Sequence, residues 1–110
     1  MNHNLFIYYN MVTAYEDAVI KAIQSLGNVT RLGNGFWYIN ASVNASEALK
    51  RVASRMTNKD SAIIIDSTNN QTLWFNLDEA QAQRIRQNWD MPLGQSPKTA
   101  DGNEQESPIH

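Results

Sequence analysis

The chain has 110 residues, no cysteine and a formal net charge of −2, and this length is typical of one small domain. The absence of cysteine excludes disulfides, thiolate metal ligands and a cysteine nucleophile. Residues 91–110 carry one lysine and three carboxylates, so this segment alone accounts for the net charge. The rest of the chain is neutral, which argues against a strong general attraction to nucleic acid but allows a local basic patch.

The sequence shows no targeting or membrane segment. The first residues lack the basic stretch and apolar run of a secretory signal peptide, and the longest apolar run is far too short to cross a bilayer. We therefore expect a cytoplasmic protein without membrane contact. The two histidines, His3 and His110, lie near the chain ends. They do not form a metal-binding pair, and we expect no cofactor.

The first part of the sequence predicts a strand followed by a helix. Residues 5–9 are apolar, with aromatic and β-branched side chains typical of a strand. Apolar side chains then recur at helical spacing over residues 15–26. Thr13 and Glu16 have the spacing of a capping box, so we expect Thr13 to cap this helix. Gly27 predicts its C-terminal end.

A similar pattern follows. Residues 29–32 and 36–39 predict two strands joined by a Gly-Asn-Gly turn. Asn44 predicts the N-cap of a second helix over residues 45–56, and residues 62–65 predict a buried strand.

The last part of the sequence predicts one more strand, one more helix and a tail. Residues 72–75 read as a strand, and Asp78 caps a helix with a weak apolar stripe. Beyond this helix Pro, Gly, Ser and charged residues dominate without apolar periodicity. We therefore expect a folded domain over residues 1–90 and a disordered polar, acidic tail over residues 91–110.

The order of these elements predicts an α+β fold of the ferredoxin-like βαββαβ type, with an added C-terminal strand and helix. In such a fold the first and third strands are central and the two main helices cover one face of the sheet. Both strands are apolar on both faces, so one apolar face stays uncovered. We expect that face to carry Phe6, Tyr8, Trp37 and Ile39. A second subunit, the last helix or a ligand must cover it, and symmetric dimers are the commonest oligomers.

Two sets of polar residues are candidate sites. Asn10 ends the first strand, where it either contacts a ligand or metal or serves the turn into the helix. Four basic residues lie on or just after the second helix, where they form either a phosphate-binding patch or an ordinary solvated helix face: Lys50, Arg51, Arg55 and Lys59. No pair of carboxylates has a spacing that predicts general acid–base or two-metal catalysis.

Three segments carry a family resemblance: residues 6–11 (FIYYNM), residues 35–40 (GFWYIN) leading into the capped helix, and residues 58–65 (NKDSAIII). Through them, residues 4–90 resemble the small CRISPR-associated adaptation protein that partners the CRISPR integrase. The resemblance implies a ferredoxin-like homodimer with facing sheets and a C-terminal strand that reaches across to the partner. The wider group includes metal-dependent nucleases, DNA-binding scaffolds and toxin-like proteins. The nucleases have a Mg²⁺-binding Asp where this chain has Asn10, and a neutral amide suits that cation poorly.

The leading hypothesis is therefore a catalytically silent homodimer that binds nucleic acid or a protein partner, a divergent pseudo-nuclease of the Cas-adaptation type. The first alternative is a metal-dependent nuclease of toxin type that uses Asp66 or a water-mediated site. The second alternative is an RNA-binding sheet in which aromatic side chains stack on bases: Phe6, Tyr8, Phe36 and Tyr38.

Overall fold

The computed structural model describes residues 2–90, and the tail expected at residues 91–110 lies outside the described residues. The described residues divide into two units, the first ending at Leu77 and the second beginning at Asp78, and each is described by itself. No helix among residues 2–90 has the length and apolar character that a membrane crossing requires.

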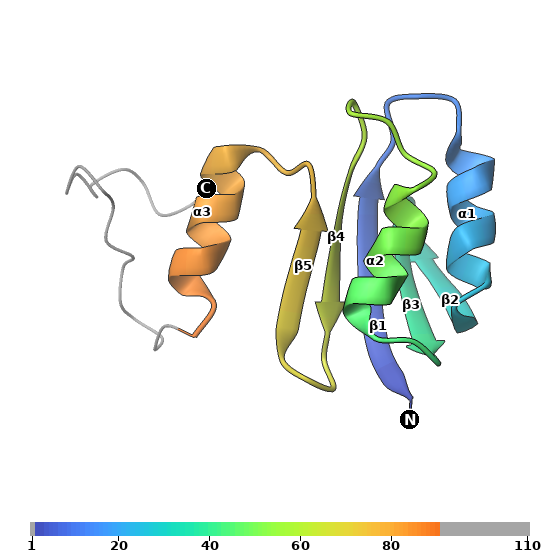
Figure 1. Ribbon diagram of the computed structural model, residues 1–110, viewed down its shortest axis with the longest axis horizontal. Coiled ribbons are helices and arrows are strands. Elements are labelled where there is room, and N and C mark those ends of the chain that lie inside the picture. The colour runs from blue at the N-terminus through green and yellow to red at the C-terminus, as the bar shows by residue number, and fades with distance from the viewer. Residues whose placement is uncertain (1, 91–110) are drawn as a thin grey trace. The chain divides into compact units, whose positions relative to one another are not determined.

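The first unit has an α+β fold built on one five-stranded antiparallel sheet with the strand order β2-β3-β1-β4-β5. The predicted α+β class is confirmed, and both the first and the third strand have neighbours on each side. The elements are labelled in Figure 1: β1 His3–Asn10, α1 Glu16–Gln24, β2 Gly27–Gly33, β3 Phe36–Ala41, α2 Ala45–Ala53, β4 Ser61–Asp66 and β5 Gln71–Phe75.

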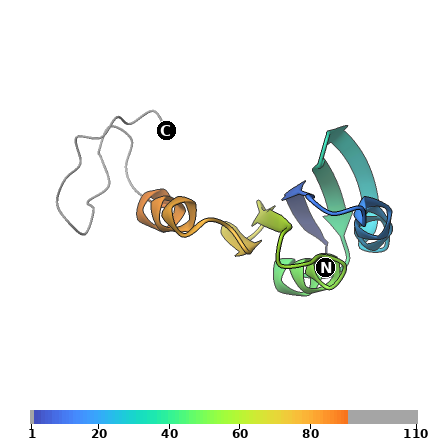
Figure 2. The same ribbon diagram turned by 90° about the horizontal axis from the view of Figure 1, so that it is seen from above.

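Helices α1 and α2 lie on the same face of the sheet (Figure 2). The core fills the space between them and this face, because every second strand residue points toward the helices. These side chains are excluded from water, which stabilises the fold by roughly 25 cal/mol per Å² of apolar surface. The largest buried apolar side chains are Leu5, Ile7, Val19, Ile23, Leu26, Ile39, Val52 and Ile64.

The expected capping box of the first helix is wrong. Helix α1 begins at Glu16, and Tyr15 at its N-cap makes no side-chain capping bond. The Thr13 hydroxyl instead donates to the Asp60 carboxylate, at 2.9 and 3.2 Å from its two oxygens. The Thr13 hydroxyl, which the local pattern predicts as the cap of the first helix, is therefore hydrogen-bonded to a buried carboxylate far along the chain.

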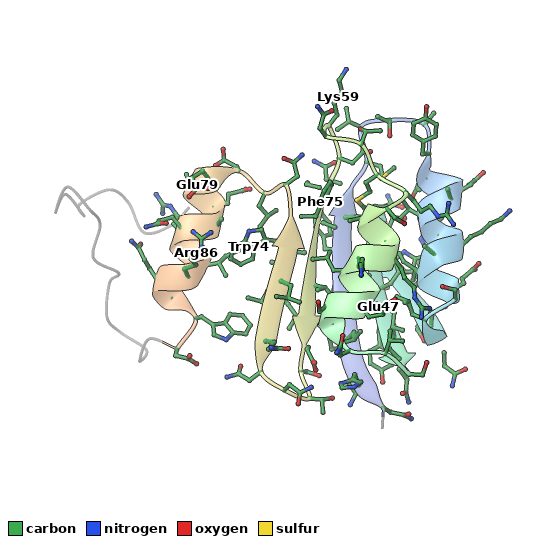
Figure 3. All side chains as sticks on the ribbon, in the orientation of Figure 1. Glu47, Lys59, Trp74, Phe75, Glu79 and Arg86 are labelled. Atoms are coloured by element: carbon green, nitrogen blue, oxygen red, sulfur yellow. The ribbon has the colours of Figure 1, made fainter. Side chains whose placement is uncertain are left out.

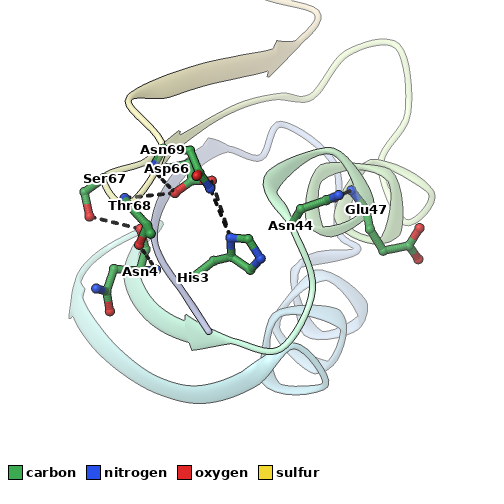
Figure 4. Close-up of polar contacts among 8 residues, drawn as sticks. All are labelled: His3, Asn4, Asn44, Glu47, Asp66, Ser67, Thr68 and Asn69. Carbon is green, nitrogen blue, oxygen red and sulfur yellow. Dashed lines mark hydrogen bonds and ion pairs between the residues drawn. The ribbon is translucent and has the colours of Figure 1, made fainter. Parts of the chain in front are cut away.

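The expected cap of the second helix is confirmed. The Asn44 side chain accepts a hydrogen bond from the Glu47 backbone N–H at 2.9 Å (Figure 4). The cap satisfies a backbone N–H of the first turn, and the helix buries three side chains in the core: Ala45, Ala48 and Val52.

Gly27 does not end the first helix as expected. It lies in β2 with a φ of 155°, and a Cβ atom there would lie 2.1 Å from the Asn40 carbonyl oxygen. Gly27 is therefore needed for the close approach of β2 to β3. The turn before β3 is confirmed: Gly35 has a φ of 71°, and its carbonyl accepts from the Tyr9 N–H at 2.8 Å.

The second unit contains helix α3, Glu79–Asn88 (Figure 1). The expected cap is confirmed, because the Asp78 carboxylate accepts from the backbone N–H groups of Ala80 and Gln81 at 3.1 and 3.3 Å. Glu79 and Arg86 lie on this helix with a carboxylate–guanidinium separation of 3.8 Å (Figure 3).

Candidate functional site

The face of the sheet opposite α1 and α2, here called the open face, carries a row of aromatic side chains. In the register of β1 and β3, Phe6 lies opposite Tyr38 and Tyr8 lies opposite Phe36. The Phe6 ring centroid is 5.2 Å from that of Tyr38 and 6.5 Å from that of Phe36. Aromatic pairs at these separations stabilise each other beyond the area that they bury.

The open face is apolar at its centre and exposed to solvent. The exposed fraction is 50% for Tyr8, 39% for Phe36 and 38% for Ile65. Ile65 lies on β4 directly opposite Phe6 on β1, so the apolar surface continues from β3 to β4. Exposed apolar side chains that are contiguous indicate a surface for another molecule.

The open face also lacks charge. The alternation of side chains along each strand and the register of the five strands define which residues lie on this face. Among the described residues that lie on it there is no Lys, Arg, Asp or Glu. The members are Asn4, Phe6, Tyr8, Asn10, Asn28, Thr30, Gly33, Phe36, Tyr38, Asn40, Ser61, Ile63, Ile65, Thr72 and Trp74.

The expectation that Trp37 and Ile39 share this face is wrong. Trp37 lies opposite Ile7 and Ile39 lies opposite Leu5, so both point toward the helices. Their exposed fractions are 5% and 0%. The third strand therefore presents Phe36 and Tyr38 on the open face, as the RNA-binding alternative requires.

On the helix side, Tyr9 and Trp37 belong to a polar cluster that sequence reasoning missed. The Tyr9 hydroxyl donates to Glu16 Oε2 at 2.7 Å, and the Arg31 guanidinium lies 3.6 Å from the same oxygen. Arg31 also lies over the Trp37 ring, 5.4 Å from its centroid. Burial, together with the hydrogen bond to Glu16, raises the pKa of Tyr9. The cluster ties β1, α1, β2 and β3 together.

Asn10 is exposed at the end of β1, opposite Ser61 of β4. Of the two buried carboxylates, Asp66 lies opposite Leu5 on the helix side of the sheet, and Asp60 lies in the loop before β4. Among residues 2–90, no three side chains of the types His, Cys, Asp and Glu gather as metal ligands would.

The four basic residues on or just after the second helix divide into two pairs. Arg51 and Arg55 line a groove between α1 and α2, together with Lys21 of α1, which sequence reasoning did not include. Lys50 is exposed on α2, and Lys59 projects from the loop before β4 (Figure 3). An ion pair forms within α2, with Arg51 Nε 3.1 Å from Glu47 Oε2.

Asp60 is fully buried and joins two loops. Its carboxylate accepts from the N–H groups of Val12, Thr13 and Thr57 at 2.8, 3.1 and 2.9 Å, and from both threonine hydroxyls. Burial by itself would raise the pKa of the Asp60 carboxyl. The hydrogen bonds from Thr57, Val12 and Thr13 outweigh burial and hold this pKa well below its usual range.

Asp66 is also fully buried and organises the turn between β4 and β5 (Figure 4). Its carboxylate accepts from the Thr68 and Asn69 N–H groups at 2.9 and 3.1 Å and from Asn69 Nδ2 at 2.8 Å. Burial opposes ionisation, but these bonds, with His3 Nδ1 at 3.7 Å, lower the pKa of Asp66. Both carboxylate oxygens are therefore engaged in holding the turn.

Comparison with protein-family models, with curated proteins and with solved structures gives no match for this chain.

Proposed function

We propose that the protein is a non-catalytic binding protein that works as a symmetric homodimer, with the open faces of two subunits in contact. The observation that carries this proposal is an apolar, uncharged sheet face with Tyr8 and Phe36 exposed at its centre. Two identical faces of this kind meet under a two-fold axis without placing like charges together. Burial of their apolar atoms favours the pair by roughly 25 cal/mol per Å².

The size of the face is sufficient for a dimer. Five strands at ordinary spacing make the face about 24 Å wide. Strands of five to eight residues make it about 20 Å long. Two such faces bury about 1,000 Å² in total, which is the lower limit for a stable protein interface. We therefore expect a dimer that dissociates measurably on dilution.

We assign the first four strands to the ferredoxin-like type. The chain order from β1 to β4 is strand, helix, strand, strand, helix, strand, and β4, β1, β3 and β2 are neighbours in that order. Strand β5 extends the sheet beyond β4 by pairing within its own chain. This differs from the crossing strand that the Cas-adaptation resemblance implies, and the proposed interface therefore rests on the open face alone.

The state of the carboxylates supports a binding role over a nuclease role. Asn10, at the position of the family's metal-binding Asp, offers a neutral amide. Asp66, the residue assigned to the nuclease alternative, has no exposed surface and already accepts three hydrogen bonds. A metal ion could reach it only if the turn between β4 and β5 opened.

One observation favours RNA binding by the sheet as a second candidate function. Phe6, Tyr8, Phe36 and Tyr38 share the open face, as a base-stacking surface requires. The same face lacks cationic side chains near the aromatics, whereas single-strand binding surfaces pair stacking with positive charge. The two candidates use the same surface, so they are mutually exclusive in one complex.

Analytical ultracentrifugation over a range of concentrations tests the proposal with the wild-type protein and the variants Tyr8→Glu and Tyr15→Glu. Both tyrosines are exposed, but Tyr15 precedes α1 and lies off the sheet. We expect a wild-type dimer, a monomeric Tyr8→Glu and a dimeric Tyr15→Glu. A monomeric wild type that binds single-stranded RNA through Tyr8 would replace the proposal with the RNA-binding alternative.

A further inference from the structure

A groove runs between the two helices on the side of the sheet away from the open face. It has a volume of about 400 Å³ and is lined by three cationic side chains, Lys21 from α1, Arg51 from α2 and Arg55 from the turn that follows α2. Arg55 lies four residues after Arg51, in the turn where its backbone N–H donates to the Val52 carbonyl at 3.1 Å. Small side chains line the rest of the groove and leave it open: Ala18, Ala22, Ser25 and Ser54.

The cations of this groove outnumber their acidic partners. Among residues 2–90, neither Lys21 nor Arg55 forms an ion pair. Arg51 forms one ion pair, with Glu47. Glu16 of α1 is engaged by Tyr9 and Arg31. Mutual repulsion of cations held together is relieved when an anion binds between them.

The neutral side chains of the groove contribute little to ligand recognition. The Ser25 hydroxyl donates to the Ala22 carbonyl at 2.6 Å, and the Ser54 hydroxyl donates to the Arg51 carbonyl at 2.7 Å. Their protons are thus used within each helix. The donors that remain are the ammonium group and the guanidinium groups, whose planar forks match phosphate oxygens.

We infer that this groove binds the phosphodiester backbone of a nucleic acid, without base-specific contacts. The inference deepens the proposed function by naming a ligand class, and it rests on that function only in assigning the open face to the partner subunit. Each subunit then carries one groove on its outer side. Because the contacts are to phosphates, binding weakens steeply with salt and depends little on sequence.

The cations also have an ordinary structural use, since Lys21 and Arg51 lie in the last turns of their helices. There a positive charge interacts favourably with the helix dipole. A purely structural role predicts that removing the cations lowers stability and leaves nucleic-acid affinity unchanged. The thermal midpoint of each variant is therefore measured beside its affinity.

The test compares two double variants of equal charge change, Lys21→Gln/Arg55→Gln in the groove and Lys50→Gln/Lys59→Gln outside it. Fluorescence anisotropy with a short labelled DNA duplex and with labelled single-stranded RNA, at about 50 and 200 mM salt, gives affinity and its salt dependence. Sedimentation of the same samples reports dimerisation separately. Inorganic phosphate alone, titrated to about 10 mM, distinguishes a small-anion site from a backbone site.

We expect the groove variant to lose about tenfold or more in affinity at the lower salt and to show a shallower salt dependence. The control variant should lose much less, and both should dimerise as the wild type does. Equal losses in the two variants, no binding by the wild type, or saturation by phosphate without nucleic-acid binding would each overturn the inference. A monomeric wild type whose groove still binds would contradict the dimer and retain the groove.

Discussion

The rings of Phe6 and Tyr38 face each other across β1 and β3 with centroids 5.2 Å apart, and the Tyr38 hydroxyl donates to Asn4 Oδ1 at 2.6 Å. This hydrogen bond ties one aromatic ring of the open face to the start of β1. The open face is consequently an ordered surface in the single subunit, and a partner would meet it without reordering these side chains.

Replacing Tyr38 with phenylalanine tests that arrangement. Tyr38→Phe keeps the ring and removes the hydrogen bond to Asn4, so we expect the free energy of unfolding to fall by about 0.5–1.5 kcal/mol. The dimer should persist, because the apolar ring remains. Urea denaturation measures the first effect and sedimentation measures the second. Loss of dimerisation in this variant would mean that the hydroxyl, not the ring, makes the contact.

Replacing Asp60 with asparagine tests the link between the loop before α1 and the loop before β4. The asparagine amide keeps one acceptor oxygen. Its NH₂ group cannot accept from the backbone N–H groups that donate to the carboxylate in the wild type. We expect a clearly lower thermal midpoint, measured by circular dichroism. The matched control is Asp17→Asn on the exposed first turn of α1, which should leave the midpoint nearly unchanged. Equal effects in the two variants would contradict the clamp.

Acid should destabilise the protein through Asp60 and Asp66. Both have a folded-state pKa below the unfolded value of about 4, so their ionised forms stabilise the fold above that pH. As the pH falls below about 4, the unfolded chain takes up protons first and this contribution is lost. Urea denaturation from neutral pH to about pH 2.5 should show little loss of stability from these two groups above about pH 5 and a progressive fall below it. The fall should be shallower in Asp60→Asn, and an unchanged slope would contradict the assignment.

Two glycines of β2 should respond oppositely to alanine. Gly27→Ala places a Cβ against the Asn40 carbonyl at a φ of 155°, so we expect a loss of about 2 kcal/mol or more. Gly33 has no atom within 4 Å of an added Cβ, and Gly33→Ala should be neutral or stabilising within about 1 kcal/mol. Urea denaturation of the pair checks this prediction. A tolerated Gly27→Ala would indicate a β2–β3 approach looser than the one described.

Local patterns predicted the strands and helices, because side-chain periodicity and turn residues act within a few positions. The predicted sheet face was wrong for Trp37 and Ile39. The face on which a side chain lies depends on the register between neighbouring strands. The sequence held a usable signal: across the hairpin, Val29 pairs with Ile39 and Thr30 pairs with Tyr38. The apolar partner Val29 indicates that Ile39 lies on the core side, and the polar partner Thr30 indicates that Tyr38 lies on the open face.

The remaining errors have a common cause, which is contact between residues far apart in sequence. Thr13 matched a capping pattern, but its acceptor is Asp60, 47 residues away. Lys21 joins Arg51 and Arg55 only because α1 and α2 lie side by side. No spacing within either helix predicts that meeting.

The most direct test of the central claim is chemical crosslinking of single-cysteine variants, since the chain has no cysteine of its own. Tyr8 lies on β1, the middle strand of five, so two copies of residue 8 lie near a two-fold axis through the open faces. We predict that a short bis-maleimide joins Tyr8→Cys subunits into covalent dimers, while Ser54→Cys, on the helix side, stays monomeric under the same conditions. Efficient crosslinking of Ser54→Cys with none at Tyr8→Cys would contradict the proposed interface.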